Sequence, residues 1–172
     1  MLNDYNKWAF TTEEQAKFNT WLERINNIHT GNIDLRNSEI HLSTPSKPLT
    51  DSTVALFTTA GVHLTSDEPF DIESHHGDWT FRTIPVDVDS SNLTITHTHY
   101  NHVEADKDIN CIFPIDRLRE LQEEGMIGRL SPYAYSIMGF NPDPTNLVNK
   151  TIPELAAQYK LDGVDILFMT CG

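Results

Sequence analysis

The fold is decided by the last ten residues of the sequence, Gly163-Val164-Asp165-Ile166-Leu167-Phe168-Met169-Thr170-Cys171-Gly172. Gly163 is placed to end a helix, and residues 164–169 form a mostly apolar run that predicts a strand buried on both faces. Such strands are typical of parallel sheets, because crossover helices cover both sides of the sheet. In open α/β sheets the ligand binds just beyond the carboxyl ends of the strands. We therefore expect a truncated domain that lacks its last covering helix, its active site or both.

Strands and helices alternate upstream of this run. Apolar runs and period-two patterns predict strands at 53–59, 93–99 and 133–139, with a shorter extended segment at 80–85. Strands that alternate with helices indicate βαβ units and a mostly parallel sheet. The expected fold is α/β, with a three-layer, Rossmann-like arrangement that is truncated at its C-terminal end.

Two helices are expected within this domain. The first covers residues 114–124, and three apolar residues mark its inner side: Ile115, Leu118 and Leu121. The second runs from 151 to 162 and opens on a capping box, in which Thr151 is the N-cap and Glu154 stands three residues later.

The first 50 residues are expected to form a helical N-terminal extension and a linker. Residues 11–31 predict a helix, because Thr11 and Glu14 form a capping box and apolar residues follow at helical spacing. Residues 51–172 then form the α/β domain. A chain of 172 residues is long enough for one such domain with a sizeable core.

Composition excludes several classes of function. The 12 Lys and Arg residues against 25 Asp and Glu residues give a formal charge of −13, which argues against nucleic acid or an anionic membrane surface as a partner. The two cysteines make no disulfide framework and favour a reducing compartment. The longest apolar run is shorter than the roughly 18 residues of a membrane span, and we expect a cytoplasmic protein.

Histidine supplies the first candidate site. Six of the eight histidines lie between His63 and His102. In a strand over 93–99, His97 and His99 point to one face and are placed to share a metal ion or an anionic ligand. A metal site needs a third ligand that the spacing does not place, so polar residues lining a cleft are favoured and no metal is assigned. The adjacent His75 and His76 are expected on the surface.

An arginine and two cysteines complete the candidates. Arg82, close to Asp78, is placed either to bind a carboxylate bidentately or to form a structural salt bridge. Cys111 is expected to be an inert core residue. Cys171 stands at the carboxyl end of the last strand, where the dipole of a following helix would lower its pKa and make it nucleophilic.

Several sequence blocks occur in an order that resembles a known family. They are Thr53-Val54-Ala55-Leu56, Ala60-Gly61-Val62-His63-Leu64, Gly77-Asp78-Trp79-Thr80-Phe81-Arg82-Thr83-Ile84-Pro85, Thr96-His97-Thr98-His99-Tyr100, residues 106–119 and Gly163-Val164-Asp165. Together they resemble the selenoprotein B family of glycine, sarcosine, betaine and D-proline reductases. The resemblance covers residues 51–172 and leaves the first 50 residues outside.

The resemblance implies an oxidoreductase subunit that cleaves a carbon–nitrogen bond reductively. A partner subunit carries a pyruvoyl group that holds a small amine or amino-acid substrate, and a selenocysteine supplies the nucleophile. By this resemblance the selenocysteine stands immediately after Gly172, encoded by an in-frame UGA codon, and Cys171 is its neighbour. A chain without this residue is expected to be inactive.

The resemblance also strengthens particular site residues. His97 or His99 is expected to protonate the leaving nitrogen, because imidazole titrates near neutrality. Arg82 is expected to hold the substrate carboxylate, with His63 and Asp78 as further substrate-binding candidates. Cys171, His97 and His99 are thus the catalytic candidates.

Two other functions stay open. The first is a non-catalytic binding subunit with the same fold, and the second is a metal-dependent hydrolase or lyase built on His97 and His99. A dinucleotide site is not expected, because no G-x-G-x-x-G motif follows a strand. An apolar final strand without a covering helix would favour self-association into a homo-oligomer.

Overall fold

The computed structural model describes residues 44–172 together with Thr12 and Ala16, both of which are helical. The chain divides into two units, Met1–His41 and Leu42–Gly172, and the second contains the elements described below. The predicted helix at 11–31 and most of the predicted extension at 1–50 lie outside the described residues.

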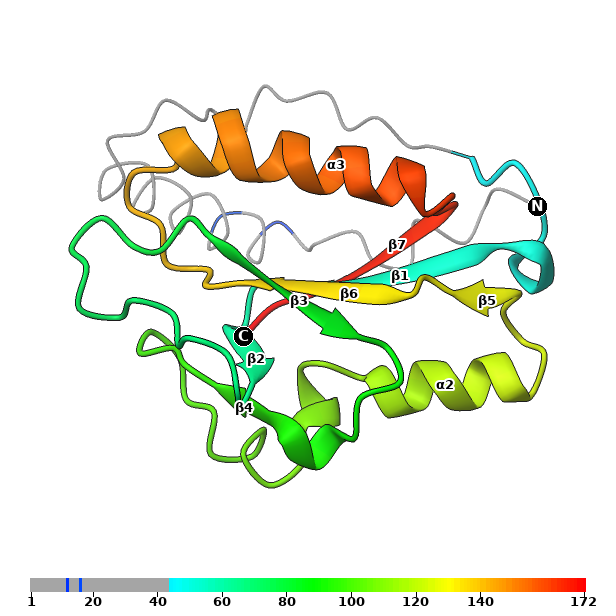
Figure 1. Cartoon of the computed structure of the whole chain (residues 1–172), viewed down its shortest axis with the longest axis horizontal. Helices are drawn as coiled ribbons and strands as arrows, with labels where there is room; N and C mark the ends of the chain where they lie inside the picture. Colours follow the sequence, from blue (N-terminus) through cyan, green and yellow to red (C-terminus); the bar gives the residue numbers. More distant parts are fainter. Residues whose placement is uncertain (1–11, 13–15, 17–43) are drawn as a thin grey trace. The chain divides into compact units, whose positions relative to one another are not determined.

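A mostly parallel sheet is built around a buried central strand, β1 (Thr53–Thr58), which follows a short 3-10 turn at Leu49–Asp51 (Figure 1). One edge of β1 pairs in parallel with β7 (Ile166–Thr170). The other edge pairs in parallel with β5 (Arg129–Leu130) and then with β6 (Tyr133–Ile137). The outer strand β3 (Phe81–Pro85) runs antiparallel to β6. The described unit is therefore a mixed α/β structure, and its predicted strands at 53–59, 80–85 and 133–139 are confirmed.

A small second sheet contains His63, the first histidine of the segment between His63 and His102. It pairs β2 (Val62–Leu64) with β4 (Leu93–Ile95) in antiparallel fashion, and a 3-10 turn at Ser90–Asn92 precedes β4. The prediction of one strand over 93–99 was wrong beyond Ile95. Val62 is the last pairing partner of β4, and Gly61 before it adopts a φ of 71° that turns the chain away. Residues after 96 therefore have no strand to pair with.

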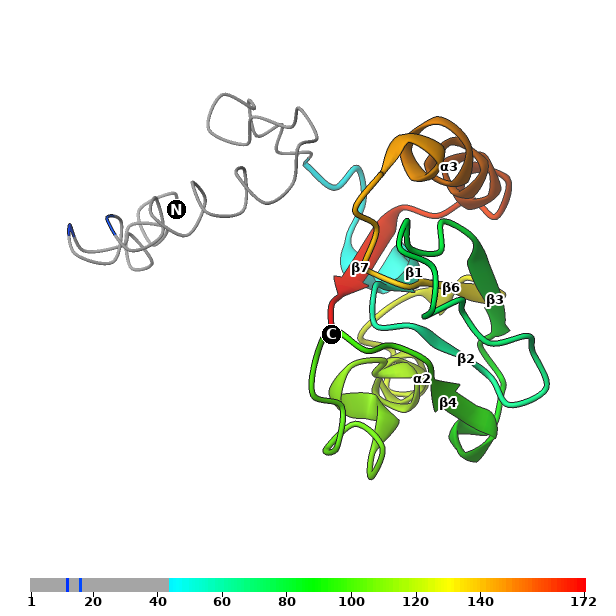
Figure 2. The same cartoon turned by 90° about the vertical axis from the view of Figure 1, so that its left-hand side faces the viewer.

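Two helices cover opposite faces of the main sheet (Figures 1 and 2). Helix α2 (Ile115–Glu123) packs on the face that carries Val54 and Leu56, and a 3-10 turn at Ile109–Cys111 precedes it. Helix α3 (Ile152–Leu161) packs on the face that carries Phe57 and Tyr135. Successive residues of β1 point to opposite faces, so a single strand supplies both cores.

Two details of the helices differ from prediction. Leu121 is 37% exposed, whereas Ile115 and Leu118 are buried. Each step of three residues falls about 60° short of a full turn, so Leu121 lies roughly 120° around the helix from Ile115. Thr151 is the N-cap residue of α3, but the predicted capping box does not form, because its side chain makes no capping hydrogen bond and a π-helical turn, Leu147–Thr151, precedes the helix. The Thr151 hydroxyl donates instead to the carbonyl oxygen of Trp79.

Strand β7 is less buried than predicted. Its three central residues, Leu167, Phe168 and Met169, are 39%, 44% and 62% exposed. The strand pairs on one side with β1, and within residues 44–172 no other strand pairs with it. The sequence predicted an apolar strand of a parallel sheet, left uncovered on one side, whereas residues on both faces of β7 are partly exposed in the described unit. The Rossmann-like arrangement and the truncation stay predictions.

No helix in the described part of the chain is long and apolar enough to cross a membrane.

Candidate functional site

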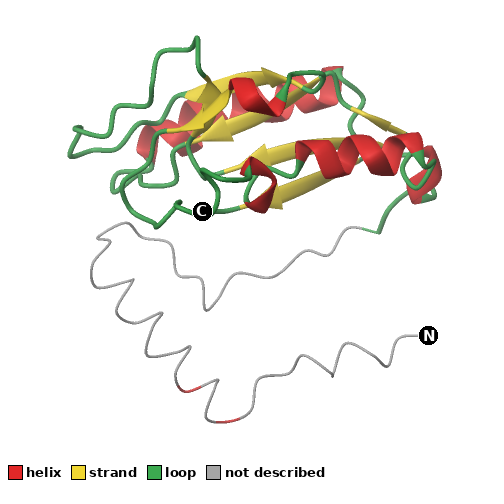
Figure 3. Ribbon diagram, turned by 90° about the horizontal axis from the view of Figure 1, so that it is seen from below, coloured by secondary structure: helices red, strands yellow, loops and turns green. Residues whose placement is uncertain are grey.

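The carboxyl ends of β1, β6 and β7 meet at one end of the main sheet. The Thr59 amide donates to the carbonyl oxygen of Thr170, the last residue of β7, at 3.1 Å. The Gly61 amide donates to the carbonyl oxygen of Ile137, the last residue of β6, at 3.0 Å. Figure 3 shows loops gathered at this end, where the last residue also lies. The edge is therefore formed by segments that are far apart in the sequence.

The segment after β4 lies across this end and brings aromatic side chains together. The His99 ring stacks on Phe140, with centroids 3.5 Å apart and planes 9° apart. The His97 ring lies 6.0 Å from His99 and 4.9 Å from Tyr100, edge to face in both cases. We call His97, His99, Tyr100, Phe140 and the pair Cys171-Gly172 the carboxyl-edge site. His97 and His99 are thus brought together as expected, although no strand places them.

The end of β7 joins this site through Gly172. A β-carbon added at Gly172 would lie 2.5–2.9 Å from three carbons of the Tyr100 ring, so the glycine backbone lies directly against that ring. Figure 2 places the end of the chain beside the segment that follows β4. Cys171, one of the predicted catalytic residues, is exposed and free at this position.

His97 is held in its neutral form. Its Nδ1 accepts a hydrogen bond from the His99 amide at 3.0 Å, so the ring proton is on Nε2. Burial lowers the pKa of His97 below its ordinary value of 6.5, and the nearby imidazoles of His99 and His102 lower it further. His97 therefore offers an Nε2–H donor at neutral pH rather than an imidazolium.

This arrangement predicts the titration of His97. Its imidazole resonances in an NMR titration are expected to show a midpoint below 6.5. Because the folded-state pKa is depressed, neutral His97 favours folding above pH 6.5, and this contribution is lost as pH falls through the folded pKa. A His97→Gln variant should accordingly lose less stability than the wild type between pH 7 and pH 5. A midpoint above 6.5 would contradict this account.

Tyr100 and Phe140 were not predicted as site residues. The Tyr100 hydroxyl donates to the carbonyl oxygen of Ala60 at 2.9 Å. Burial, assisted by the charge of Asp106, raises the pKa of Tyr100 to about 12, so the phenol stays neutral. The position of Tyr100 directly after the His97–His99 pair was the available signal in the sequence. Nothing in the sequence brings Phe140 to this edge.

Cys111 is exposed, and the prediction that it is a core residue was wrong. Cys111 is the last residue of the 3-10 turn Ile109–Cys111. Ile109 in that turn and Ile112 after it pack against the core. Those two residues and the fully buried Phe113 take the inward positions, which leaves the cysteine facing outward.

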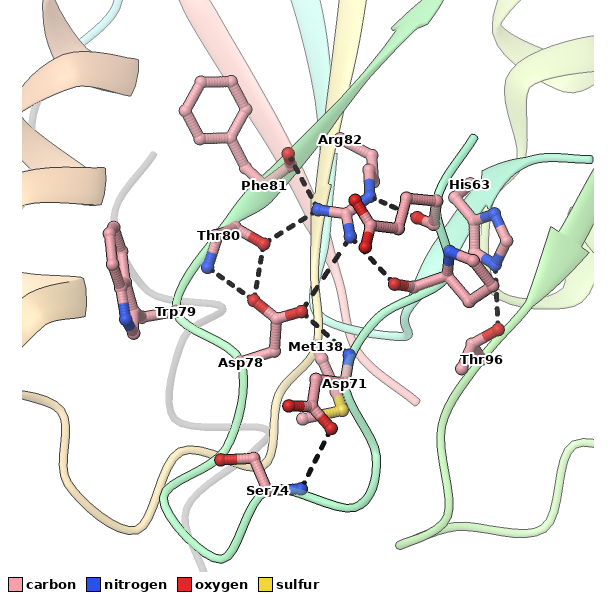
Figure 4. Close-up of polar contacts among 12 residues, drawn as sticks. His63, Asp71, Ser74, Asp78, Trp79, Thr80, Phe81, Arg82, Thr96 and Met138 are labelled. Carbon is pink, nitrogen blue, oxygen red and sulfur yellow. Dashed lines mark hydrogen bonds and ion pairs between the residues drawn. The ribbon is translucent and has the colours of Figure 1, made fainter. Parts of the chain in front are cut away.

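A second polar cluster surrounds Arg82, and we call it the Arg82 network (Figure 4). Nε of Arg82 donates to the carbonyl oxygen of Glu68 at 2.9 Å, and Nη2 donates to that of Pro69 at 3.1 Å. Nη1 donates to the Thr80 hydroxyl at 2.8 Å. The guanidinium also lies over the Phe70 ring, 4.2 Å from its centroid. The donors of Arg82 are therefore engaged within the protein.

Asp78 is the acid of this network and is 9% exposed. Its carboxylate accepts from the Asp71 amide at 2.9 Å and from the Thr80 amide at 2.8 Å, and it lies 3.9 Å from Nη2 of Arg82. Burial alone would raise the pKa of Asp78, but the Thr80 hydroxyl, these two amides and Arg82 together lower it. The network thus ties the loop before β3 to the start of that strand.

His63 is buried on β2 between these two clusters. Its Nδ1 donates to the carbonyl oxygen of Leu64 at 2.7 Å, so Nε2 accepts from the Thr96 hydroxyl at 2.8 Å. Its ring meets the edge of Phe70, which Arg82 also covers. Both ring nitrogens are occupied, as are the donors of Arg82. Roles of His63, Asp78 and Arg82 in substrate binding remain predictions.

Among residues 44–172, no three His, Cys, Asp or Glu side chains gather closely enough to hold a metal ion. His75 and His76 are exposed, as predicted.

The fold and the carboxyl-edge site together define an α/β protein with imidazoles and a thiol at the end of its sheet where ligands bind. The chain belongs to the glycine/sarcosine/betaine reductase selenoprotein B family, whose model matches residues 17–172. The resemblance in the sequence was expected to start at residue 51, but the family model already matches from residue 17.

Individual relatives agree with this assignment. The chain is 42% identical over 127 residues to the D-proline reductase subunit gamma of Acetoanaerobium sticklandii, covering 74% of this chain and 51% of that protein. It is 32% identical over 128 residues to the glycine reductase complex component B subunit gamma of Carboxydothermus hydrogenoformans, covering 72% and 29%. It is 28% identical over 138 residues to the betaine reductase complex component B subunit beta of Peptoclostridium acidaminophilum, covering 78% and 31%.

The chain thus spans about half the length of the first relative and about three-tenths of the other two. No solved structure matches the chain.

Proposed function

We propose that this chain belongs to a reductase subunit that cleaves a carbon–nitrogen bond of a small amine or amino acid. Its membership of the selenoprotein B family supports the reaction class. The observation that carries the proposal is the contact of the end of β7 with Tyr100, beside His97. This contact brings a thiol-bearing segment and an imidazole to the end of the sheet where α/β proteins bind ligands.

The nucleophile is assigned to the residue that follows Gly172, as a selenocysteine. When present, it supplies a selenolate that displaces nitrogen from the α-carbon of the substrate. Two described side chains support an anion at this position, because His97 offers an Nε2–H donor and the phenol of Tyr100 stays neutral. The raised pKa of Tyr100, about 12, keeps its phenol neutral at any physiological pH.

The two imidazoles differ in what they offer a substrate. His97 presents Nε2–H, since its Nδ1 is occupied by the His99 amide. This donor suits a hydrogen bond to a carboxylate or to the leaving nitrogen. The His99 ring is exposed and held in one plane by Phe140, and its Nδ1 meets the Thr98 hydroxyl at 3.0 Å. Protonating an amine requires an imidazolium, so His97 serves this step only through its minor protonated form, because its pKa is lowered. We assign the protonation of the leaving nitrogen to one of these two residues.

The first test is the nucleotide sequence of the gene. The codon after that of Gly172 is expected to be UGA, followed by an open frame that encodes further strands and helices. A different stop codon with no downstream frame would refute the selenocysteine assignment.

The imidazoles are tested in the full-length selenium-containing protein with its partner subunits. Replacing the histidine that donates the proton by glutamine is expected to lower kcat about 100-fold, which is the lower end for general acid catalysis. His75→Ala, a change in an exposed loop, is the matched control and should leave kcat unchanged. Unchanged kcat in both His97→Gln and His99→Gln would remove the assignment to these residues.

The remaining parts of the proposal rest on the family resemblance and on the composition. A partner subunit with a pyruvoyl group is expected to hold the amine, and a cytoplasmic location is expected from the composition. The relatives are components of multi-subunit reductases, which supports the existence of partner subunits. In the described residues no observation favours the metal-dependent hydrolase.

A further inference from the structure

Tyr100 makes contacts in four directions at the carboxyl edge. Its hydroxyl donates to the carbonyl oxygen of Ala60, just after β1. Its ring meets His97 at 4.9 Å and His102 at 5.6 Å between centroids, with interplanar angles of 66° and 62°. Its carbons Cδ1, Cε1 and Cζ lie against the backbone of Gly172. One side chain therefore touches the chain after β1, the imidazole of His97 and the end of β7.

The anchor of this ring is rigid. Tyr100 is half-buried and packs against the core cluster on the α2 face of the sheet. Its hydrogen bond to Ala60 reaches a residue that is fully buried and bridges to Met138 after β6. The ring is thus fixed by the sheet itself, whereas Cys171 and Gly172 lie beyond the last paired residue of β7.

We propose that Tyr100 is a positioning residue, whose ring holds the backbone at Gly172 at a set distance from His97. The catalytic purpose of this contact rests on the proposed function. The contact between Tyr100 and Gly172 does not depend on that function. The role belongs to the ring rather than to the hydroxyl, because the carbons Cε1 and Cζ make the close approach. It also explains a glycine at 172, since any β-carbon there would overlap the ring.

The test is a double-mutant cycle between positions 100 and 172, measured without enzyme turnover. The chain carries a Cys111→Ser change, so that Cys171 is the single thiol. Gly172→Ala is introduced with Tyr, Phe or Leu at position 100. Phenylalanine keeps Cε1 and Cζ, whereas leucine lacks both atoms and still fills part of the volume. The readouts are the rate of Cys171 alkylation by iodoacetamide and the NMR resonances of the His97 imidazole.

With Tyr or Phe at position 100, Gly172→Ala is expected to change the alkylation rate about threefold, the lower end of coupling between touching residues. The His97 resonances should shift in the same variants. With Leu at position 100, the same change should alter neither readout. A Gly172→Ala effect of equal size with Tyr and Leu would overturn the proposal, as would no effect with Tyr.

Circular dichroism of every variant checks that the chain is folded. If Tyr100→Leu fails to fold, the Tyr100→Phe background still decides, because loss of the Gly172→Ala effect there would assign the role to the hydroxyl and refute the ring. The codon after Gly172 tests the reductase proposal, and the double-mutant cycle tests the role of Tyr100. A failure of the first therefore does not change the outcome of the second.

Discussion

Replacing Arg82 by alanine is expected to lower the free energy of unfolding by about 3 kcal/mol, a value typical of breaking a buried ion pair. The side chain is 15% exposed and pairs with Asp78, which is 9% exposed. Its loss leaves the Asp78 carboxylate without its ionic partner and the carbonyl groups of Glu68 and Pro69 without their side-chain donor. Chemical denaturation followed by circular dichroism measures the change.

Arg117→Ala is the matched control for this prediction. The Arg117 side chain is 60% exposed and pairs with Glu120 on the surface of α2, so its loss should change stability by less than about 0.5 kcal/mol. Arg82→Lys keeps the charge but loses the planar fork, and it should recover only part of the stability. If Arg82→Ala is as mild as the control, Arg82 is not a structural residue, and its assignment to substrate binding gains support.

Replacing Gly61 by alanine is expected to lower the free energy of unfolding by about 3 kcal/mol, more than the left-handed conformation alone accounts for. Gly61 has a φ of 71°, and a β-carbon there would overlap the carbonyl oxygen of Thr96 and lie 3.2 Å from Cβ of His97. The backbones of Gly61 and Thr96 must therefore move apart. The His97 resonances are expected to move in the same variant, because the displaced backbone carries that residue.

Gly125 provides the comparison that separates the two causes. It has a φ of 70° at the end of α2, but nothing lies within 4 Å of an added β-carbon. Gly125→Ala should therefore lower stability by only about 1 kcal/mol, the amount that left-handed backbone imposes on a residue with a β-carbon. Equal effects at the two positions would mean that the close approach of Gly61 to Thr96 does not exist in solution.

Local patterns predicted four of the five strands of the main sheet and both of its helices, and they missed the two-residue strand β5. The apolar run at 53–59 and the helix start at Pro114 depend on neighbouring residues, and both predictions were confirmed. The errors arose where distant segments decide the outcome. The strand predicted at 93–99 ended at Ile95 because the turn at Gly61 removes its partner, and alternation within the segment carries no information about that turn.

The candidate site was predicted in part for the same reason. His97, His99 and Cys171 could be named from their types and positions, and the structure brings the two histidines to the end of β7. Tyr100 was not predicted, because the alternation over residues 93–99 singles out only the two histidines. Phe140 becomes part of the site through the topology of the sheet, and no local pattern indicates it.

The pairing of β1 with β7 also has a consequence for the order of folding. The Thr53 amide, at the start of β1, bonds to the carboxylate of Asp165, a partner 112 residues later in the chain. Contacts of such sequence separation form slowly, because the entropy of closing the loop opposes them until the ends meet. During synthesis the histidines and Tyr100 leave the ribosome long before β7 does. The carboxyl-edge site therefore cannot form until β7 has been synthesised, and until then the edge of β1 that pairs with β7 has no partner.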